Sequence, residues 1–255
     1  MSLEAHRLDE SLGPEQLHAS RSGAAAAGIT SGDAAGADGS RGAWQRAFPL
    51  QQERQLIKAR HSIYRAGEIL SGVPIVHSGW AARVRRLSDG RRQILSFILP
   101  GELISAGTVF ADRLSCYVEA ITDVRYAVYR RAEPGELLAR DPNLLQALIS
   151  GCLAEKAELE ELATDLGRRR AEERIARLFL QLKSRLQVSG QGSGQASGTS
   201  FDMPLRQQHI ADATGMTVIH VGRVMGALRN DGIIQLSGGV LVITDLAALK
   251  RLAEV

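Results

Sequence analysis

The chain has 255 residues, 44% of them hydrophobic and 4% aromatic, and a formal net charge of +3. This length suits two modest domains with cores of mainly aliphatic side chains. The chain has two cysteines, Cys116 and Cys152. They are too few and too far apart to form a disulfide framework or a cysteine-rich metal site. No apolar run approaches the roughly 20 residues of a membrane-spanning helix, and no signal peptide is evident. We therefore expect a cytoplasmic protein that has no membrane partner and binds no metal or cofactor.

The N-terminal segment and the charge distribution give the first clues to organisation. Residues 1–42 are dominated by Ala, Gly, Ser and Asp, a composition that predicts a disordered tail. Residues 168–255 carry 12 Lys and Arg against 7 Asp and Glu, a surplus of +5 (12 − 7) that leaves −2 for the rest of the chain. A basic C-terminal third permits a polyanionic partner, although a solvated basic face would have the same count.

Residues 43–140 are predicted to form an antiparallel β-barrel that serves as a sensory domain. Trp80, Ala82 and Val84 are spaced by two, as in a strand with one face toward a core. Asp89-Gly90 then gives a strong hairpin signal, because glycine accepts the positive φ of a tight turn. Several short strands separated by turns favour a small barrel or jelly roll.

A heptad pattern predicts a dimerisation helix over residues 141–167, with Asp141-Pro142 as a helix start. Glu155 interrupts the pattern once. The apolar positions, spaced by three and four, are Leu145, Leu148, Cys152, Leu159, Leu162 and Leu166. So narrow an apolar stripe favours pairing with the same helix of a second copy, hence a homodimer. The alternative is a helix that packs on its own barrel.

Residues 168–255 are predicted to be a winged helix-turn-helix DNA-binding domain. Ala211 is small where two short helices would cross, and Gly215, four residues later, allows the left-handed backbone of the turn. The second helix is expected over residues 217–228, with Thr217 as its cap. Two apolar segments around Ser237-Gly238-Gly239 then predict a β-hairpin, which in this place is the wing. The alternative is any helical hairpin with a glycine turn.

Three stretches of the chain resemble the CRP/FNR family of bacterial transcription regulators. Residues 89–102 resemble the hairpin before the family's effector cassette, and residues 168–178 resemble the helix after its dimerisation helix. Residues 207–228 resemble its DNA-binding unit, especially in the FNR- and FixK-like branch. The resemblance covers about residues 60–255.

This resemblance implies an α+β fold, with an N-terminal antiparallel β-barrel like the jelly roll of cyclic-nucleotide-binding domains, a long dimerisation helix and a C-terminal winged helix-turn-helix. It implies a sequence-specific regulator, not an enzyme, that binds a near-palindromic operator in double-stranded DNA as a homodimer. If it is an activator, it also contacts RNA polymerase. The activity of the regulator would be controlled by an unknown effector that acts on the barrel, or by the abundance of the protein.

The resemblance also implies which residues contact DNA. They are Arg206, Gln207, Thr217, Val218, Ile219, His220, Gly222 and Arg223. Arg223 matches the family's arginine that reads guanine, and Ile219 stands where a glutamate usually contacts cytosine. We therefore expect the half-site to keep a guanine under Arg223 and to tolerate or prefer thymine beside Ile219.

Two departures from the family bear on the effector. Ala106 and Leu114 stand where cAMP-binding members have the glutamate for ribose and the arginine for phosphate, so cyclic-nucleotide binding is not expected. Two cysteines cannot supply the four thiolates of an iron–sulfur cluster. Both cysteines are instead expected to be small buried residues.

The sequence is also compatible with other functions. A haem-responsive sensor would need an axial ligand, for which His61 and His77 qualify only by residue type, and a redox-responsive sensor would use a cysteine. A protein of another class would have an effector-binding or enzymatic barrel and vestigial DNA binding. The wing and the helix pair in the same chain speak against that last alternative.

Overall fold

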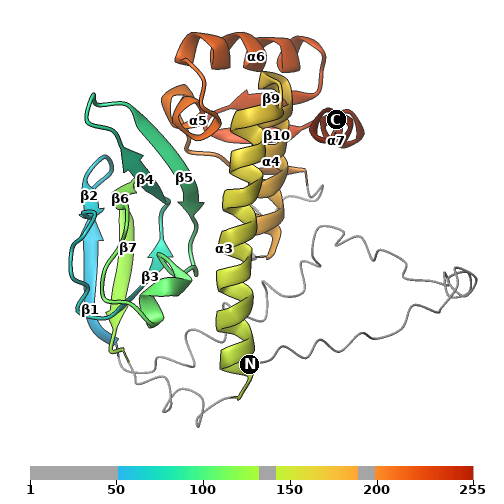
Figure 1. Cartoon of the computed structure of the whole chain (residues 1–255). Helices are drawn as coiled ribbons and strands as arrows, with labels where there is room; N and C mark the ends of the chain where they lie inside the picture. Colours follow the sequence, from blue (N-terminus) through green and yellow to red (C-terminus); the bar gives the residue numbers. More distant parts are fainter. Residues whose placement is uncertain (1–50, 132–141, 189–198, 255) are drawn as a thin grey trace, which may run out of the picture. The chain divides into compact units, whose positions relative to one another are not determined.

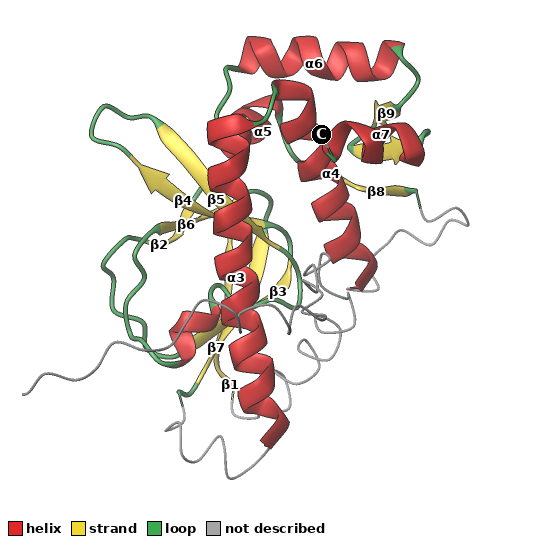
Figure 2. Cartoon of the chain, turned by 45° about the vertical axis from the view of Figure 1, so that its right-hand side comes forward, coloured by secondary structure: helices red, strands yellow, loops and turns green. Residues whose placement is uncertain are grey.

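The computed structural model describes residues 51–131, 142–188 and 199–254. The predicted tail at residues 1–42 lies outside the described residues, as does Asp141, the expected helix start. Figure 1 shows the elements in chain order, and Figure 2 separates helices from strands by colour.

Residues 51–131, which we call the β-domain, form two antiparallel sheets. One has the order β1-β7-β3 and the other β2-β6-β4-β5. The elements are β1 (Gln51–Ile57), β2 (Ser62–Tyr64), β3 (Val73–Ser78), β4 (Ala81–Arg86), β5 (Arg92–Ile98), the short 3-10 helix η1 (Ala106–Val109), β6 (Tyr117–Ala120) and β7 (Val124–Tyr129). The predicted hairpin turn lies between β4 and β5, where Gly90 has a φ of +86°.

Strand β4 is buried more completely than the predicted alternation suggests. Ala82 and Val84 face one apolar cluster as expected, but Ala81 is equally buried in a second cluster, and Arg83 is also buried. The reason is that an apolar cluster packs on each face of the sheet at β4. Apolar and polar residues alternate along a strand only where one face of the sheet is in contact with solvent.

The remaining residues form two long helices and a winged helix-turn-helix. The elements are α3 (Pro142–Arg168), α4 (Ala171–Val188), β8 (Ser200–Asp202), α5 (Gln207–Thr214), α6 (Val218–Asn230), β9 (Ile234–Ser237), β10 (Val240–Ile243) and α7 (Leu246–Ala253). Strands β8, β10 and β9 make one antiparallel sheet, whose β9–β10 hairpin is the predicted wing. Fully buried side chains of α4, such as Phe179 and Ile175, share a core with Ile210 of α5 and Val221 of α6.

Helix α3 divides the predicted heptad positions between two faces. Leu148 is only 2% exposed, because it packs with Ile75, Val109 and Tyr129 of the β-domain. Glu155 also faces the β-domain, and Leu162 is half-buried. Leu148 is therefore unavailable to a partner helix, which corrects its assignment to the dimer seam.

A different set of α3 residues, which we call the outward stripe, is exposed beside the face of α3 that packs on the β-domain. It keeps the spacing of three and four and consists of Ile149, Cys152, Lys156, Leu159, Ala163 and Leu166, all exposed in the single chain. Ile149 is 50% and Leu159 42% exposed. The predicted seam and this stripe share Cys152, Leu159 and Leu166, whereas the side chain of Leu145 lies outside the described residues.

The turn between α5 and α6 depends on Gly215, which has a φ of +66°. A Cβ added there would lie 2.4 Å from Cδ2 of Leu166. We expect Gly215→Ala to lower the free energy of unfolding by about 1–2 kcal/mol, mostly through the left-handed backbone, since the tip of Leu166 can move. Denaturant unfolding measures this change.

Gly226 provides the matched control for this substitution. It lies inside α6, and an added Cβ would meet no atom within 4 Å. Gly226→Ala should therefore raise the free energy of unfolding by up to about 1 kcal/mol, because alanine favours a helix. Equal stability of the Gly215→Ala variant and the parent would contradict the role given to this turn.

Candidate nucleic-acid interface

Helix α6 is positioned by hydrogen bonds at both ends of the preceding turn. Helix α5 ends at Thr214 and is capped by Gly215, whose N–H donates to the carbonyl of Ala211. Thr217 then caps α6, since its hydroxyl accepts a hydrogen bond from the N–H of His220 at 3.2 Å. The predicted cap is confirmed, and α6 itself begins at Val218 and continues to Asn230, two residues beyond the predicted end.

The two faces of α6 differ sharply in burial. Val221, Val224, Met225 and Leu228 are buried in the core of the domain. Ile219, by contrast, is 70% exposed. Its neighbours His220 and Arg223 are exposed as well. An exposed isoleucine beside an exposed arginine is the kind of surface that can pack on a thymine methyl group and bond to a guanine edge.

The start of α5 contributes a second group of exposed side chains. Arg206 and Gln207 are exposed, and Gln207 lies close to α6, with Oε1 at 3.4 Å from the position of a Cβ on Gly222. Nδ1 of His209 accepts a hydrogen bond from the N–H of Arg206 at 3.2 Å. Burial and the positive charges of Arg206 and Arg92 lower the pKa of His209, which favours this neutral acceptor form.

The eight predicted DNA-contact residues thus lie at the start of α5 and the first turns of α6. Seven of them are exposed, namely Arg206, Gln207, Thr217, Val218, Ile219, His220 and Arg223, and Gly222 is half-buried. The sequence did not indicate which residues of other elements hold α5 and α6 in place.

Helix α5 is held by side chains from two other elements. Nη1 of Arg174, on α4, donates to the carbonyl of Thr214 at 3.0 Å. Nε2 of Gln93, on β5, donates to the carbonyl of Ala213 at 3.1 Å. The β-domain and α4 therefore both contact the DNA-binding unit at the end of α5.

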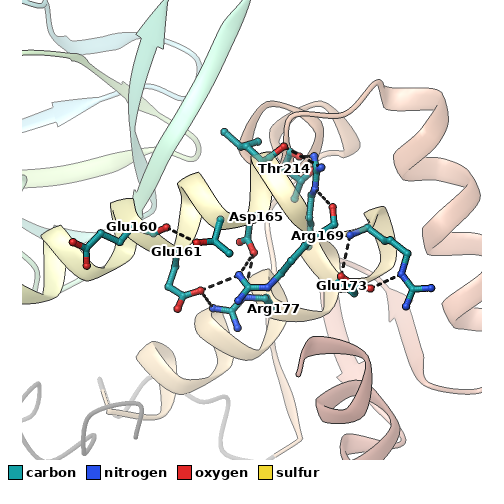
Figure 3. Close-up of polar contacts among 11 residues, drawn as sticks. Glu160, Glu161, Asp165, Arg169, Glu173, Arg177 and Thr214 are labelled. Atoms are coloured by element: carbon teal, nitrogen blue, oxygen red, sulfur yellow. Dashed lines mark hydrogen bonds and ion pairs between the residues drawn. The ribbon is translucent and has the colours of Figure 1, made fainter. Parts of the chain in front are cut away.

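Arginines after α3 form a polar junction with the acidic face of that helix (Figure 3). Nη1 of Arg169 donates to Asp165 at 2.5 Å and to Glu161 at 2.9 Å. Arg177 of α4 pairs with the same two carboxylates. Two of the arginines in the basic C-terminal third are thus paired with carboxylates of α3, whereas Arg223 is exposed in the first half of α6.

A second junction links α3, α4 and the β-domain through Arg185. Its Nη2 donates to Oε2 of Glu102 at 2.6 Å and to the carbonyl of Phe97 at 2.8 Å, while Nη1 lies 3.0 Å from Glu158. Burial alone would lower its pKa, but the carboxylates of Glu102 and Glu158 hold the pKa of Arg185 above its ordinary value. Arg185 is therefore a charged link between three parts of the chain.

The cassette positions implied by the family resemblance are apolar and buried. Ala106 and Leu114 both lie in the core of the β-domain, and the backbone N–H of Ala106 donates to Glu155 of α3 at 2.5 Å. A cyclic phosphate would find neither side chain able to bind it. We expect isothermal titration calorimetry to show no saturable cAMP or cGMP site, and a micromolar site for either nucleotide would contradict this expectation.

The two histidines considered for haem sensing have hydrogen-bond partners within the β-domain. Nε2 of His77 lies 3.2 Å from the hydroxyl of Tyr129, and Nδ1 of His61 lies 3.1 Å from the carbonyl of Ala59. Within residues 51–131, 142–188 and 199–254, no three His, Cys, Asp or Glu side chains form a metal-binding group. Cys116 is buried as predicted, whereas Cys152 is exposed in the single chain because it belongs to the outward stripe.

Taken together, the exposed face of α6, the glycine turn before it and the β9–β10 wing after it define a winged helix-turn-helix DNA-binding protein. In the part of the chain that the structure describes, no helix has the length and apolar character needed to cross a membrane.

Comparison with known proteins gives the same class. The family model of the Crp-like helix-turn-helix domain matches residues 173–252, and that of the cyclic nucleotide-binding domain matches residues 54–141. The transcriptional activator protein FnrL of Cereibacter sphaeroides is 30% identical over 193 residues, which are 75% of this chain and 77% of FnrL. The nitrogen fixation regulation protein FixK of Azorhizobium caulinodans is 32% identical over 197 residues, which are 76% of this chain and 77% of FixK.

Among solved structures, that of FixK2 from Bradyrhizobium japonicum superposes with a TM-score of 0.70 at 26% identity, covering 81% of this chain and 98% of FixK2. The chain belongs to the CRP/FNR family and is an FNR/FixK-type transcription regulator with a DNA-binding helix-turn-helix. The predicted family, fold class and function are thereby confirmed.

Proposed function

We propose that this regulator binds a near-palindromic site in double-stranded DNA as a homodimer, with α6 of each copy in successive major grooves. The observation that carries the proposal is the division of α6 into a buried face around Val221 and Val224 and an exposed face around Ile219 and Arg223. The first turns of the second helix meet base edges in proteins of this class. The regulator acts in the cytoplasm without enzymatic activity, and an activator would also contact RNA polymerase.

Each exposed side chain of this face suits a particular role. The guanidinium of Arg223 can donate two hydrogen bonds to one guanine, and Ile219 can pack on the methyl group of an adjacent thymine. Val218, His220 and Gly222 flank these two residues on the same helix. Arg206, Gln207 and Thr217 lie at helix starts, where side chains and backbone N–H groups commonly hold phosphates.

The outward stripe of α3 supports the proposed homodimer. It leaves Ile149, Leu159 and Leu166 exposed on one helix, and its three-and-four spacing is that of a helix that pairs with its copy. Cys152 lies in the same stripe, and Leu145 would extend it toward the start of α3. We therefore propose Leu145, Cys152, Leu159 and Leu166 as partner contacts, together with Ile149 and Ala163 in place of Leu148 and Leu162.

Selection of binding sites from random duplex DNA tests this proposal. We expect the enriched sequences to contain two inverted half-sites whose centres are about 10 base pairs, or one helical turn, apart. Each half-site should contain a guanine, and thymine should be tolerated or preferred next to it. Enrichment of a single half-site would contradict the homodimer, and no enrichment at all would contradict sequence-specific binding.

A further inference from the structure

A buried arginine of the β-domain holds a carboxylate that comes from α3. Arg83 lies on β4 and is only 8% exposed. Its Nη1 donates to Oε2 of Glu155 at 2.6 Å, and its Nε donates to the hydroxyl of Ser96 at 2.9 Å. A guanidinium buried to this degree requires an anion, because leaving it unpaired is costly.

Two further donors converge on the same carboxylate. The hydroxyl of Ser105 donates to Oε2 of Glu155 at 3.0 Å, and the N–H of Ala106 donates to Oε1 at 2.5 Å. Both carboxylate oxygens are therefore bound by groups of the β-domain. We call the guanidinium of Arg83, the hydroxyl of Ser105 and the N–H of Ala106 the anion cradle.

We propose that the anion cradle is a carboxylate-binding site of the β-domain, that Glu155 is its internal ligand, and that a small-molecule carboxylate is the class of effector able to take its place. The cradle offers one buried cation and two neutral donors, which match one planar carboxylate with two acceptor oxygens. Any movement of α3 away from the β-domain at Glu155 would leave Arg83 without its anion. A carboxylate that enters the cradle in place of Glu155 would therefore favour such a movement.

Displacement of Glu155 would reach the DNA-binding domain through α3. Glu158 lies one turn further along the same helix and pairs with Arg185 of α4, which also binds Glu102 of the β-domain. A shift of α3 at the cradle therefore changes the junction that holds α4. This regulatory consequence rests on the proposed function, whereas carboxylate binding by the cradle does not.

The substitution Glu155→Ala tests the cradle, because acetate contains the atoms that the substitution removes. In chloride buffer, we expect the Tm of the full-length variant to fall by about 5 °C, since a largely buried charge loses its partner. Replacing chloride with about 100 mM acetate at equal ionic strength should recover about half of that loss. The parent should show no such response, because Glu155 fills its cradle.

Glu160→Ala is the matched control on the same helix. Glu160 is exposed, and its side chain pairs with Lys156 of the same helix. This variant should keep the Tm of the parent and should not respond to acetate. The double variant Glu155→Ala/Arg83→Met, which has lost the cation of the cradle, should not respond either.

Each result decides the proposal. A Glu155→Ala variant with the Tm of the parent would overturn it, as would equal recovery in chloride and acetate or recovery that persists without Arg83. If the variant is unfolded in chloride, folding in acetate supports the proposal, and failure to fold in both overturns it.

A separate measurement of DNA binding distinguishes failure of this proposal from failure of the proposed function. The thermal measurement contains no DNA, so its outcome stands whether or not an operator is found. With a selected operator, acetate should change the Kd of the Glu155→Ala variant by at least about threefold and leave that of Glu160→Ala unchanged. A Tm response without any change in Kd would confirm the carboxylate site and contradict its coupling to DNA binding.

Discussion

Arg223→Ala is expected to weaken binding to the selected operator by about 10- to 100-fold while changing the affinity for random duplex DNA far less. The reason is that a bidentate contact between arginine and guanine contributes about 1–3 kcal/mol of discrimination. Arg223 is exposed in the first half of α6, on the face opposite the buried Val221 and Val224. Fluorescence anisotropy with both DNAs at several salt concentrations measures the two affinities and their salt dependence.

The salt dependence distinguishes base reading from phosphate binding. If Arg223 reads a base, the slope of log K against log salt should hardly change in the variant. Equal weakening on both DNAs, with a slope smaller by about one unit, would show that Arg223 only contacts phosphate. Arg229→Ala is the control, since Arg229 is exposed at the other end of α6, where its Nε donates to the carbonyl of Met225.

The double substitution Ile149→Lys/Leu159→Lys is expected to convert the protein into a monomer and to abolish operator binding. Both residues lie in the outward stripe, where each would face the same residue of the second copy across a two-fold axis. The four added lysines, next to Lys156 of each copy, would cost several kcal/mol, about 3 or more, through desolvation and like-charge repulsion. Light scattering measures the mass, and a gel shift with the operator measures DNA binding.

Ala157→Lys provides the control for this variant. Ala157 is exposed on α3 but lies two residues from Leu159, on the opposite side of the helix. It should therefore remain dimeric. A double variant that keeps the mass of a dimer would contradict the assignment of the seam.

Cys152 gives an independent measurement of the same seam in the parent protein. Because it is exposed within the outward stripe, two copies should come close enough for a disulfide across the axis. Mild oxidation should yield a covalent dimer that a reductant dissolves. Cys152→Ser should prevent its formation, whereas Cys116→Ser should not, since Cys116 is buried.

The DNA-binding unit could be predicted closely because its determinants are local in the sequence. Gly215 must adopt a positive φ, and Thr217 must cap the next helix, and both requirements concern residues within a few positions of the turn. The buried face of α6 follows from helical spacing alone. Residues 89–102 were recognisable for the same reason, since the turn at Gly90 fixes the hairpin around it.

The register of α3 could not be derived in the same way. The positions 145, 148, 152, 155, 159, 162 and 166 and the outward stripe both satisfy a spacing of three and four and share several members. A helix that packs on its own domain and also pairs with a copy needs two adjacent apolar faces, and spacing does not say which face meets which partner. Glu155, which merely interrupted the predicted seam, proved to accept hydrogen bonds from Arg83, Ser105 and Ala106 of the β-domain.

The sequence by itself thus determined the class of protein, the winged helix-turn-helix and the face of α6 that is free to read DNA. Only the tertiary structure decided which side of α3 is covered, which arginines pair with its carboxylates and what occupies the anion cradle. The physical reason is separation along the chain. Glu155 lies 72 residues from Arg83, and Arg185 lies 83 residues from Glu102. The fold alone brings such partners together, because no local backbone preference depends on them.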